Sequence, residues 1–117
     1  MRRIFLAFIN SLRALNHMAR HEKAVQQELV LLLLALPVAF FLAPSFVSFL
    51  VLIGAVVLVL LVEILNTAIE ATCDAVTTDF NKNIQIAKDA GSLAVLIAII
   101  VAATTWGYIL INTYWLS

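Results

Sequence analysis

The fold is decided by residues 46–76, which read FVSFLVLIGAVVLVLLVEILNTAIEATCDAV. About twenty consecutive apolar residues cross the ~30 Å core of a bilayer as an α-helix. Residues 46–65 meet this length with a single acid, Glu63, near the end. The helical pattern continues through Val76, where acids and an amide now interrupt it. These residues therefore predict one long helix that crosses the membrane and leaves the hydrocarbon near Glu63.

Two further apolar stretches flank this helix, and both are long enough to cross a bilayer. Residues 24–43 end at an Ala-Pro-Ser turn, and residues 84–116 follow a polar turn at 77–83. The last turns of the third stretch carry the aromatic side chains expected at a membrane–water interface, namely Trp106, Tyr108, Tyr114 and Trp115. The pattern thus predicts transmembrane helices within 24–43, 46–76 and 84–116.

Residues 1–23 predict a different kind of helix. Apolar residues recur there at helical spacing from Ile4 to Leu15, while arginines and asparagines interrupt them. A basic amphipathic helix of this kind lies in the membrane surface rather than across it. The expected architecture is an all-α integral membrane protein with a single domain, residues 1–117, built from this surface helix and three transmembrane helices.

The composition excludes a soluble domain. Hydrophobic residues make up 64% of the chain and charged residues 12%, whereas soluble domains are closer to half apolar and a quarter charged. The basic residues are also too few, and too interleaved with apolar ones, for a nucleic-acid surface. With one cysteine, Cys73, no intrachain disulfide can form.

The charged side chains are confined to one side of the expected membrane. Seven basic and seven acidic residues give a formal net charge of zero. All seven basic residues fall within residues 2–23 and 82–88, whereas the turn around Pro44 and the C-terminal tail carry no charge. Because segments rich in lysine and arginine stay in the cytoplasm, this asymmetry predicts that the N-terminus and residues 63–92 are cytoplasmic.

An acidic stripe emerges from the apolar part of the central helix. Glu63, Asn66, Glu70 and Asp74 are spaced i, i+3, i+7 and i+11, so they lie on one side of a helix. Ionisable groups at this depth are costly and usually functional. The alternative is a solvated face on a helix that has left the membrane. That alternative suits Asp74 better than Glu63, because apolar residues directly precede Glu63.

The start of the third transmembrane helix adds a cation and a hydroxyl at the same depth. Lys88 and Asp89 are followed closely by Gly91 and Ser92. A lysine that extends from a helix end toward the interface would be the ordinary explanation. The neighbouring acidic stripe favours a functional site instead.

Two carboxylates predict a magnesium site. Glu22, at the end of the surface helix, can reach the level of Glu70, and Mg²⁺ is held through one or two carboxylates plus substrate phosphates. Other chemistries lack their motifs, since the three glycines form no GxxxxGK[ST] loop and neither CxxC nor HExxH occurs. His17 and His21, at i and i+4, are interpreted as an interfacial polar pair.

The run Glu63-Ile-Leu-Asn66-Thr-Ala-Ile-Glu70-Ala-Thr-Cys-Asp74, with the later Ala87-Lys88-Asp89-Ala90-Gly91-Ser92, closely resembles the signature of the prokaryotic diacylglycerol kinase family. The resemblance covers almost the whole chain. It implies a homotrimer with three spans per subunit in the bacterial inner membrane, and active sites at the cytoplasmic interface between neighbouring subunits. It also implies ATP-dependent phosphorylation of the hydroxyl of diacylglycerol to phosphatidic acid, with Mg²⁺ bound to the nucleotide.

The resemblance further implies a role for each polar residue of the signature. Glu63 is expected to be the general base that takes the proton from the lipid hydroxyl, and Glu22 and Glu70 are the expected Mg²⁺ ligands. The residues expected to bind the nucleotide are Arg3, Glu22, Glu70, Asp79, Phe80, Lys88 and Asp89. Those expected to contact the lipid substrate are Arg3, Glu63 and Ser92, and those in supporting positions are Asn66 and Asp74.

Four positions depart from the family pattern. Asn81 stands where the loop often has histidine, and Asn10 stands where relatives are often aromatic. Leu6 replaces a residue that is often basic, which takes away one phosphate contact, and Cys73 stands where valine or isoleucine is usual.

Three other functions fit parts of the pattern. An undecaprenol kinase would use the same site on a polyprenol, but Gly91-Ser92 and the extended surface helix favour diacylglycerol. A small proton-coupled exporter subunit would use Glu63 as its proton site, although such an acid lies more naturally at mid-span. A structural membrane protein without chemistry leaves the stripe and Lys88-Asp89 unexplained.

Overall fold

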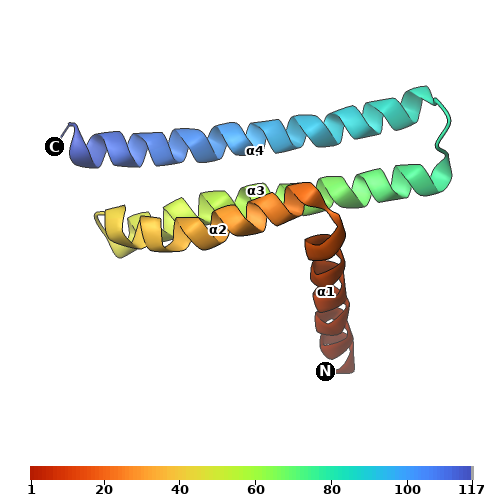
Figure 1. Ribbon diagram of the computed structural model, residues 1–117, viewed down its shortest axis with the longest axis horizontal. Coiled ribbons are helices and arrows are strands. Elements are labelled where there is room, and N and C mark those ends of the chain that lie inside the picture. Colours follow the sequence, from red (N-terminus) through yellow and green to blue (C-terminus); the bar gives the residue numbers. More distant parts are fainter. Residues whose placement is uncertain (117) are drawn as a thin grey trace.

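The computed structural model describes residues 1–116 and consists of four helices in series (Figure 1). They are α1 (Arg2–His21), α2 (Lys23–Leu42), α3 (Phe46–Val76) and α4 (Lys82–Tyr114). Residues 1–116 contain no strand. The all-α class predicted from the sequence is therefore confirmed.

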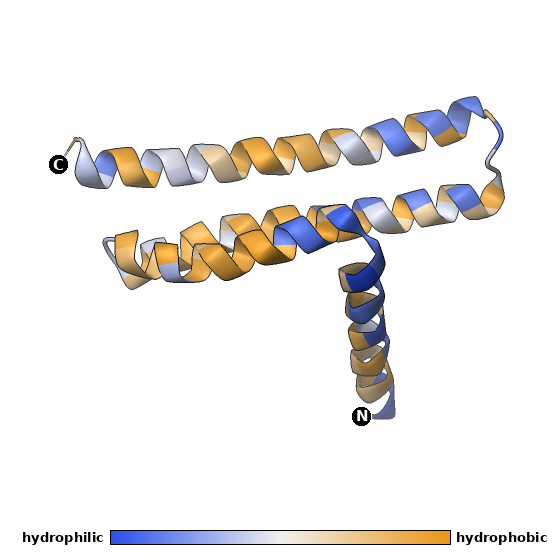
Figure 2. Cartoon of the chain, in the orientation of Figure 1, coloured by the Kyte–Doolittle hydropathy of each residue, from blue (hydrophilic) through white to orange (hydrophobic). Residues whose placement is uncertain are grey.

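Three of these helices, α2, α3 and α4, are long and apolar enough to cross a membrane. Figure 2 shows that their apolar lengths lie side by side, and that polar residues gather toward the α3–α4 turn and the α1–α2 junction. The chain is a multi-pass membrane protein with the predicted number of spans. Only 6% of the most apolar part of α4 is buried within the chain, so most of its surface is not covered by the other helices.

The long helix α3 lies between α2 and α4 and packs against both. Most of the buried side chains in these contacts are small or β-branched, which lets helices approach closely without help from the hydrophobic effect. The buried apolar residues are Val25, Ala35, Ala39, Leu52, Ala55, Val56, Val59, Cys73 and Ala98.

Two side-chain contacts fix how α4 lies along α3. Near the apolar end, the indole Nε1 of Trp106 donates a hydrogen bond to the backbone oxygen of Leu52 at 2.9 Å. Near the polar end, Nζ of Lys88 lies 2.8 Å from Oδ1 of Asp74. The two antiparallel helices are thereby held in one register at both ends.

Several helix boundaries differ by one or two residues from the predicted ones. Helix α4 begins at Lys82 rather than at residue 84, because Oδ1 of Asn81 accepts hydrogen bonds from the amides of Asn83 (2.9 Å) and Ile84 (3.2 Å). It ends at Tyr114 rather than at residue 116. Helix α2 runs through Pro37 to Leu42, one residue earlier at each end than expected.

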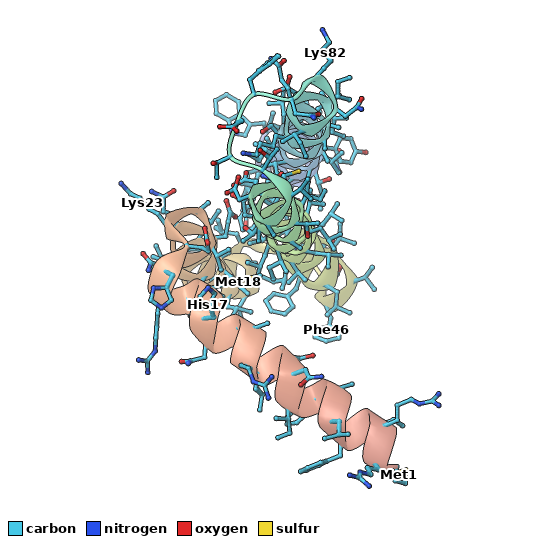
Figure 3. All side chains as sticks on the ribbon, turned by 90° about the vertical axis from the view of Figure 1, so that its right-hand side faces the viewer. Met1, His17, Met18, Lys23, Phe46 and Lys82 are labelled. Carbon is cyan, nitrogen blue, oxygen red and sulfur yellow. The ribbon has the colours of Figure 1, made fainter. Side chains whose placement is uncertain are left out.

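Helix α1 turns away from the other three helices (Figures 1 and 3). The turn occurs at Glu22, whose backbone is extended (φ −107°, ψ 109°) between α1 and α2. The substantial contact of α1 is with α2 alone, and no residue of α1 is buried. The residues that carry its exposed apolar surface are Ile4, Phe5, Leu6, Phe8, Ile9, Leu12 and Leu15.

Candidate active site

The acidic stripe predicted on α3 passes from partly buried to exposed positions. Glu63 is half-buried and Asn66 is buried, whereas Glu70 and Asp74 are exposed. Nδ2 of Asn66 donates a hydrogen bond to Oε1 of Glu70 at 3.0 Å. The buried amide therefore fixes one oxygen of an exposed carboxylate at the border of the apolar region.

The start of α4 reaches the exposed end of the stripe. Lys88 and Asp74, separated by fourteen positions in the chain, form an ion pair at 2.8 Å in which both side chains are substantially exposed to solvent. Such pairs add little to stability because water competes for both charges. The pair does place a lysine ammonium beside the carboxylates of α3.

A shallow hollow lies between the α3–α4 turn and the first turns of α4, and we call it the loop hollow. Its volume is about 280 Å³. Four of the residues predicted to bind a nucleotide line it, namely Asp79, Phe80, Lys88 and Asp89. The ring of Phe80 is 81% exposed, so it presents an aromatic face with almost no role in packing.

The sequence analysis missed the other four residues of the loop hollow, which are Thr78, Asn81, Ile84 and Gln85. Helical spacing could have found two of them, because Ile84 and Gln85 lie one turn before Lys88 and Asp89. Asn81 could have been recognised as a helix cap. The hydroxyl of Thr77 accepts a hydrogen bond from the amide of Asp79 at 3.0 Å, which orders the turn beside the hollow.

Glu22 lies at the junction of α1 and α2, and Glu70 lies on α3 in the part that leads to the α3–α4 turn. No hydrogen bond joins the side chain of Glu22 to the stripe within residues 1–116.

Arg3 is not brought to this region by the fold of the chain. It lies in the first turn of α1, at the end that points away from the other helices (Figures 1 and 3). Its guanidinium forms no hydrogen bond or ion pair within residues 1–116. Ser92, by contrast, follows Gly91 on α4, and Gly91 packs directly against Asn66.

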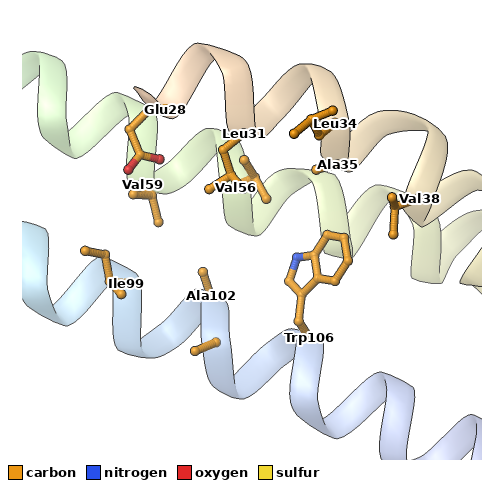
Figure 4. Close-up of a pocket in the computed structure, with 11 residues that line it drawn as sticks. Glu28, Leu31, Leu34, Ala35, Val38, Val56, Val59, Ile99, Ala102 and Trp106 are labelled. Carbon is orange, nitrogen blue, oxygen red and sulfur yellow. The ribbon is translucent and has the colours of Figure 1, made fainter. Parts of the chain in front are cut away.

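A second cavity contains an acid that the sequence analysis did not select. This apolar groove, of about 450 Å³, lies among α2, α3 and α4 (Figure 4). Glu28 is its only charged lining residue, and Oε2 of Glu28 is buried without a hydrogen-bond partner in residues 1–116. The sequence does contain a signal for this acid, because Glu28 directly precedes the apolar part of α2 and acids at this depth in a membrane are usually functional.

The profile described as prokaryotic diacylglycerol kinase matches residues 9–110. The chain belongs to the prokaryotic diacylglycerol kinase family. The resemblance stated from the two signature runs is confirmed, and Arg3 is the one predicted site residue outside the matched segment.

Three relatives, each called diacylglycerol kinase, are similar over most of their length. The Escherichia coli protein is 48% identical over 86 residues, which cover 74% of this chain and 70% of that protein. The Pseudomonas aeruginosa protein is 38% identical over 112 residues, covering 96% and 91%. The Haemophilus influenzae protein is 34% identical over 100 residues, covering 86% and 85%.

Membership of the diacylglycerol kinase family makes the chain an enzyme, a lipid kinase. The exporter and the purely structural readings of the acidic stripe are therefore wrong. Polar groups meet apolar surface along the acidic stripe, which makes the stripe and the neighbouring loop hollow the candidate site of this kinase.

The carboxylates of this kinase suit magnesium bound together with a nucleotide rather than a closed metal cage. Within residues 1–116 no three His, Cys, Asp or Glu side chains gather closely enough to hold a metal alone. Mg²⁺ usually takes one or two carboxylates, with phosphates and water completing its shell. Glu70, with one oxygen fixed by Asn66, and Glu22 are the two carboxylates predicted for such a donor set.

Proposed function

We propose that this lipid kinase transfers the γ-phosphate of ATP to the hydroxyl of diacylglycerol and so forms phosphatidic acid. In this reaction a bond forms between the lipid oxygen and the γ-phosphorus, and the bond from that phosphorus to the β–γ bridging oxygen breaks. The observation that carries the proposal is the juxtaposition, at the polar ends of α3 and α4, of a carboxylate stripe with the loop hollow.

Glu63 serves as the general base. It is half-buried at the point where the sequence of α3 passes from apolar to polar residues. A lipid hydroxyl lies at the same border of the membrane, so the carboxylate can take its proton while the acyl chains stay in the hydrocarbon. Positioned bases of this kind contribute about 10²- to 10⁴-fold to the rate.

The nucleotide binds through the loop hollow and through Mg²⁺. When bound, Mg²⁺ neutralises the charge that develops on the transferring phosphoryl group. Glu22 and Glu70 hold the ion, Lys88 and Asp89 contact the nucleotide from α4, and Asp79 and Phe80 do so from the turn. Asp74 supports Lys88 through their ion pair, and Asn66 supports Glu70.

The active unit is a homotrimer whose sites lie between neighbouring subunits. Two features of the protomer favour this arrangement, namely its large exposed apolar surface and the position of Arg3 in the first turn of α1, at the N-terminal end that points away from the other helices (Figure 1). In the trimer Arg3 contacts both substrates, and Ser92 contacts the lipid. Helix α1 lies in the surface of the bacterial inner membrane, with the sites on its cytoplasmic side, as the distribution of lysine and arginine favours.

Undecaprenol is the alternative acceptor, because the same stripe and hollow would serve a polyprenol hydroxyl. Diacylglycerol is preferred because the similar curated proteins from Escherichia coli and Pseudomonas aeruginosa are both called diacylglycerol kinase. The two lipids present the same hydroxyl group on different apolar chains, so a direct comparison of the two as acceptors distinguishes the two functions.

The test is phosphate transfer from labelled MgATP in mixed micelles, with diacylglycerol and undecaprenol as separate acceptors. We expect transfer to diacylglycerol, and we expect Glu63→Gln to lower it by about 10² or more while the affinity for ATP is retained. Transfer to undecaprenol alone would change the substrate and keep the mechanism. A Glu63→Gln protein with unchanged turnover would exclude Glu63 as the base.

A further inference from the structure

One of the three glycines is required by the packing of α4 on α3. A Cβ placed on Gly91 would overlap Oδ1 of Asn66 and lie 3.1 Å from its Cγ. By contrast, a Cβ on Gly54 or Gly107 would meet nothing within 4 Å. Gly91 therefore leaves the space that the Asn66 side chain occupies, and the other two glycines serve as natural controls.

The Asn66 amide links Gly91 to a carboxylate. Its Oδ1 is buried against Gly91 without a hydrogen-bond partner in residues 1–116, and its Nδ2 donates to Oε1 of Glu70 at 3.0 Å. The opposite orientation of the amide would set its oxygen against the carboxylate oxygen, and two acceptors repel each other. The unpartnered Oδ1 is left with the Cα–H of Gly91, which is at most a weak donor.

We infer that Gly91 is a positioning residue that acts through Asn66 on Glu70. The absence of a side chain at Gly91 lets the amide lie between α4 and the carboxylate, so that Glu70 is held in one orientation toward Mg²⁺. This inference rests on the proposed role of Glu70 as a metal ligand. It adds a residue of a different helix, with no polar side chain of its own, to the determinants of metal binding.

The structure also predicts which contact Gly91→Ala would break. The atoms that a new methyl group meets first are at the end of the Asn66 side chain, not in the backbone of α3. The side chain can therefore rotate away while the two helices stay together, and alanine also favours a helix more than glycine does. The fold is retained, and the hydrogen bond from Asn66 to Glu70 is lost.

The experiment measures the dependence of phosphoryl transfer on Mg²⁺ concentration for Gly91→Ala, with Gly54→Ala and Gly107→Ala as matched controls. We expect Gly91→Ala to raise the Mg²⁺ requirement by about 10-fold or more, the usual effect of removing the partner that holds a metal ligand. Both controls should match the wild type. Equal shifts in all three variants would overturn the inference, because a general effect of alanine in these helices would explain them.

A double variant separates positioning from packing. Asn66→Ala should reproduce the shift of Gly91→Ala, and combining the two should add nothing, because no amide remains to be displaced. Additive effects would show that Gly91 acts independently of Asn66. If Gly91→Ala does not fold but the double variant does, the clash is confirmed; if neither folds, Gly91 has a purely structural role and the inference is wrong.

Two further measurements separate this inference from the proposed function. Glu70→Gln should raise the Mg²⁺ requirement, and an unchanged requirement would refute the metal role of Glu70. The NMR signal of the ¹⁵N-labelled Asn66 side-chain amide tests positioning without any metal or turnover. That signal should move in Gly91→Ala and stay in place in Gly107→Ala, and a signal unchanged in Gly91→Ala would refute the inference alone.

Discussion

Phe80 offers the sharpest test of nucleotide binding in the loop hollow, because the fold hardly uses its side chain. The ring is 81% exposed, lines the hollow beside Asp79, and lies in the turn between α3 and α4. Substituting Phe80→Ala therefore removes a possible stacking surface for the adenine base without opening a cavity. Surface changes of this kind alter the free energy of unfolding by about 0.5 kcal/mol or less.

The expected loss of affinity follows from the stacking of a base on an aromatic ring. Such contacts are worth about 1–3 kcal/mol per base by alanine substitution, so the Kd for ATP should rise by about 5- to 150-fold. Phe80→Tyr keeps the aromatic face and should bind ATP like the wild type. For Phe80→Ala, the expected loss of binding free energy for ATP therefore exceeds the expected change in the free energy of unfolding.

The assay is equilibrium binding of MgATP to the micelle-embedded protein, with Phe41→Ala as the matched control. Phe41 is 80% exposed like Phe80, but it lies near the end of α2 at the opposite end of the bundle. Phe41→Ala should leave the Kd for ATP unchanged. A Kd for Phe80→Ala equal to that of the wild type, or an equal loss in Phe41→Ala, would refute the assignment of the loop hollow to the nucleotide.

Two further predictions concern the contacts between α3 and α4. Trp106→Phe removes the donor to the Leu52 carbonyl and should lower the free energy of unfolding by about 0.6 kcal/mol, the average for hydrogen bonds between membrane helices. Pulse proteolysis along an SDS titration measures this free energy, and an unchanged value would show that the bond is not formed. Asp74→Asn removes the charge that holds Lys88 and should weaken ATP binding, because the lysine is no longer held at the loop hollow. Unchanged binding in a dye-displacement titration would mean that Lys88 does not need Asp74.

The acidic stripe could be predicted from sequence because a helix converts spacing directly into position. Glu63, Asn66, Glu70 and Asp74 belong to one uninterrupted helix in the structure, so their common side follows from the helical repeat alone. The gathering of Asp79, Phe80 and Lys88 is nearly as local, because a short turn and the first turns of α4 contain all three.

Other features of the site depend on helices that meet from distant parts of the chain. Nothing in the sequence around Gly91 indicates that it faces Asn66, and glycine is equally compatible with the open positions of Gly54 and Gly107. In the sequence Glu28 is only the last charged residue before the apolar part of α2, whereas its neighbours in the apolar groove come from α3 and α4 as well.

The number of spans, the segregation of charge and the polar side of α3 follow from the order of residues alone, because backbone hydrogen bonds within a helix are local and its repeat is fixed. The register of α4 on α3 does not, and the Lys88–Asp74 pair and the contact of Gly91 with Asn66 depend on that register. Between apolar helices in a membrane, register depends on close packing and a few hydrogen bonds. These contacts join residues far apart in the chain, and no local pattern specifies them.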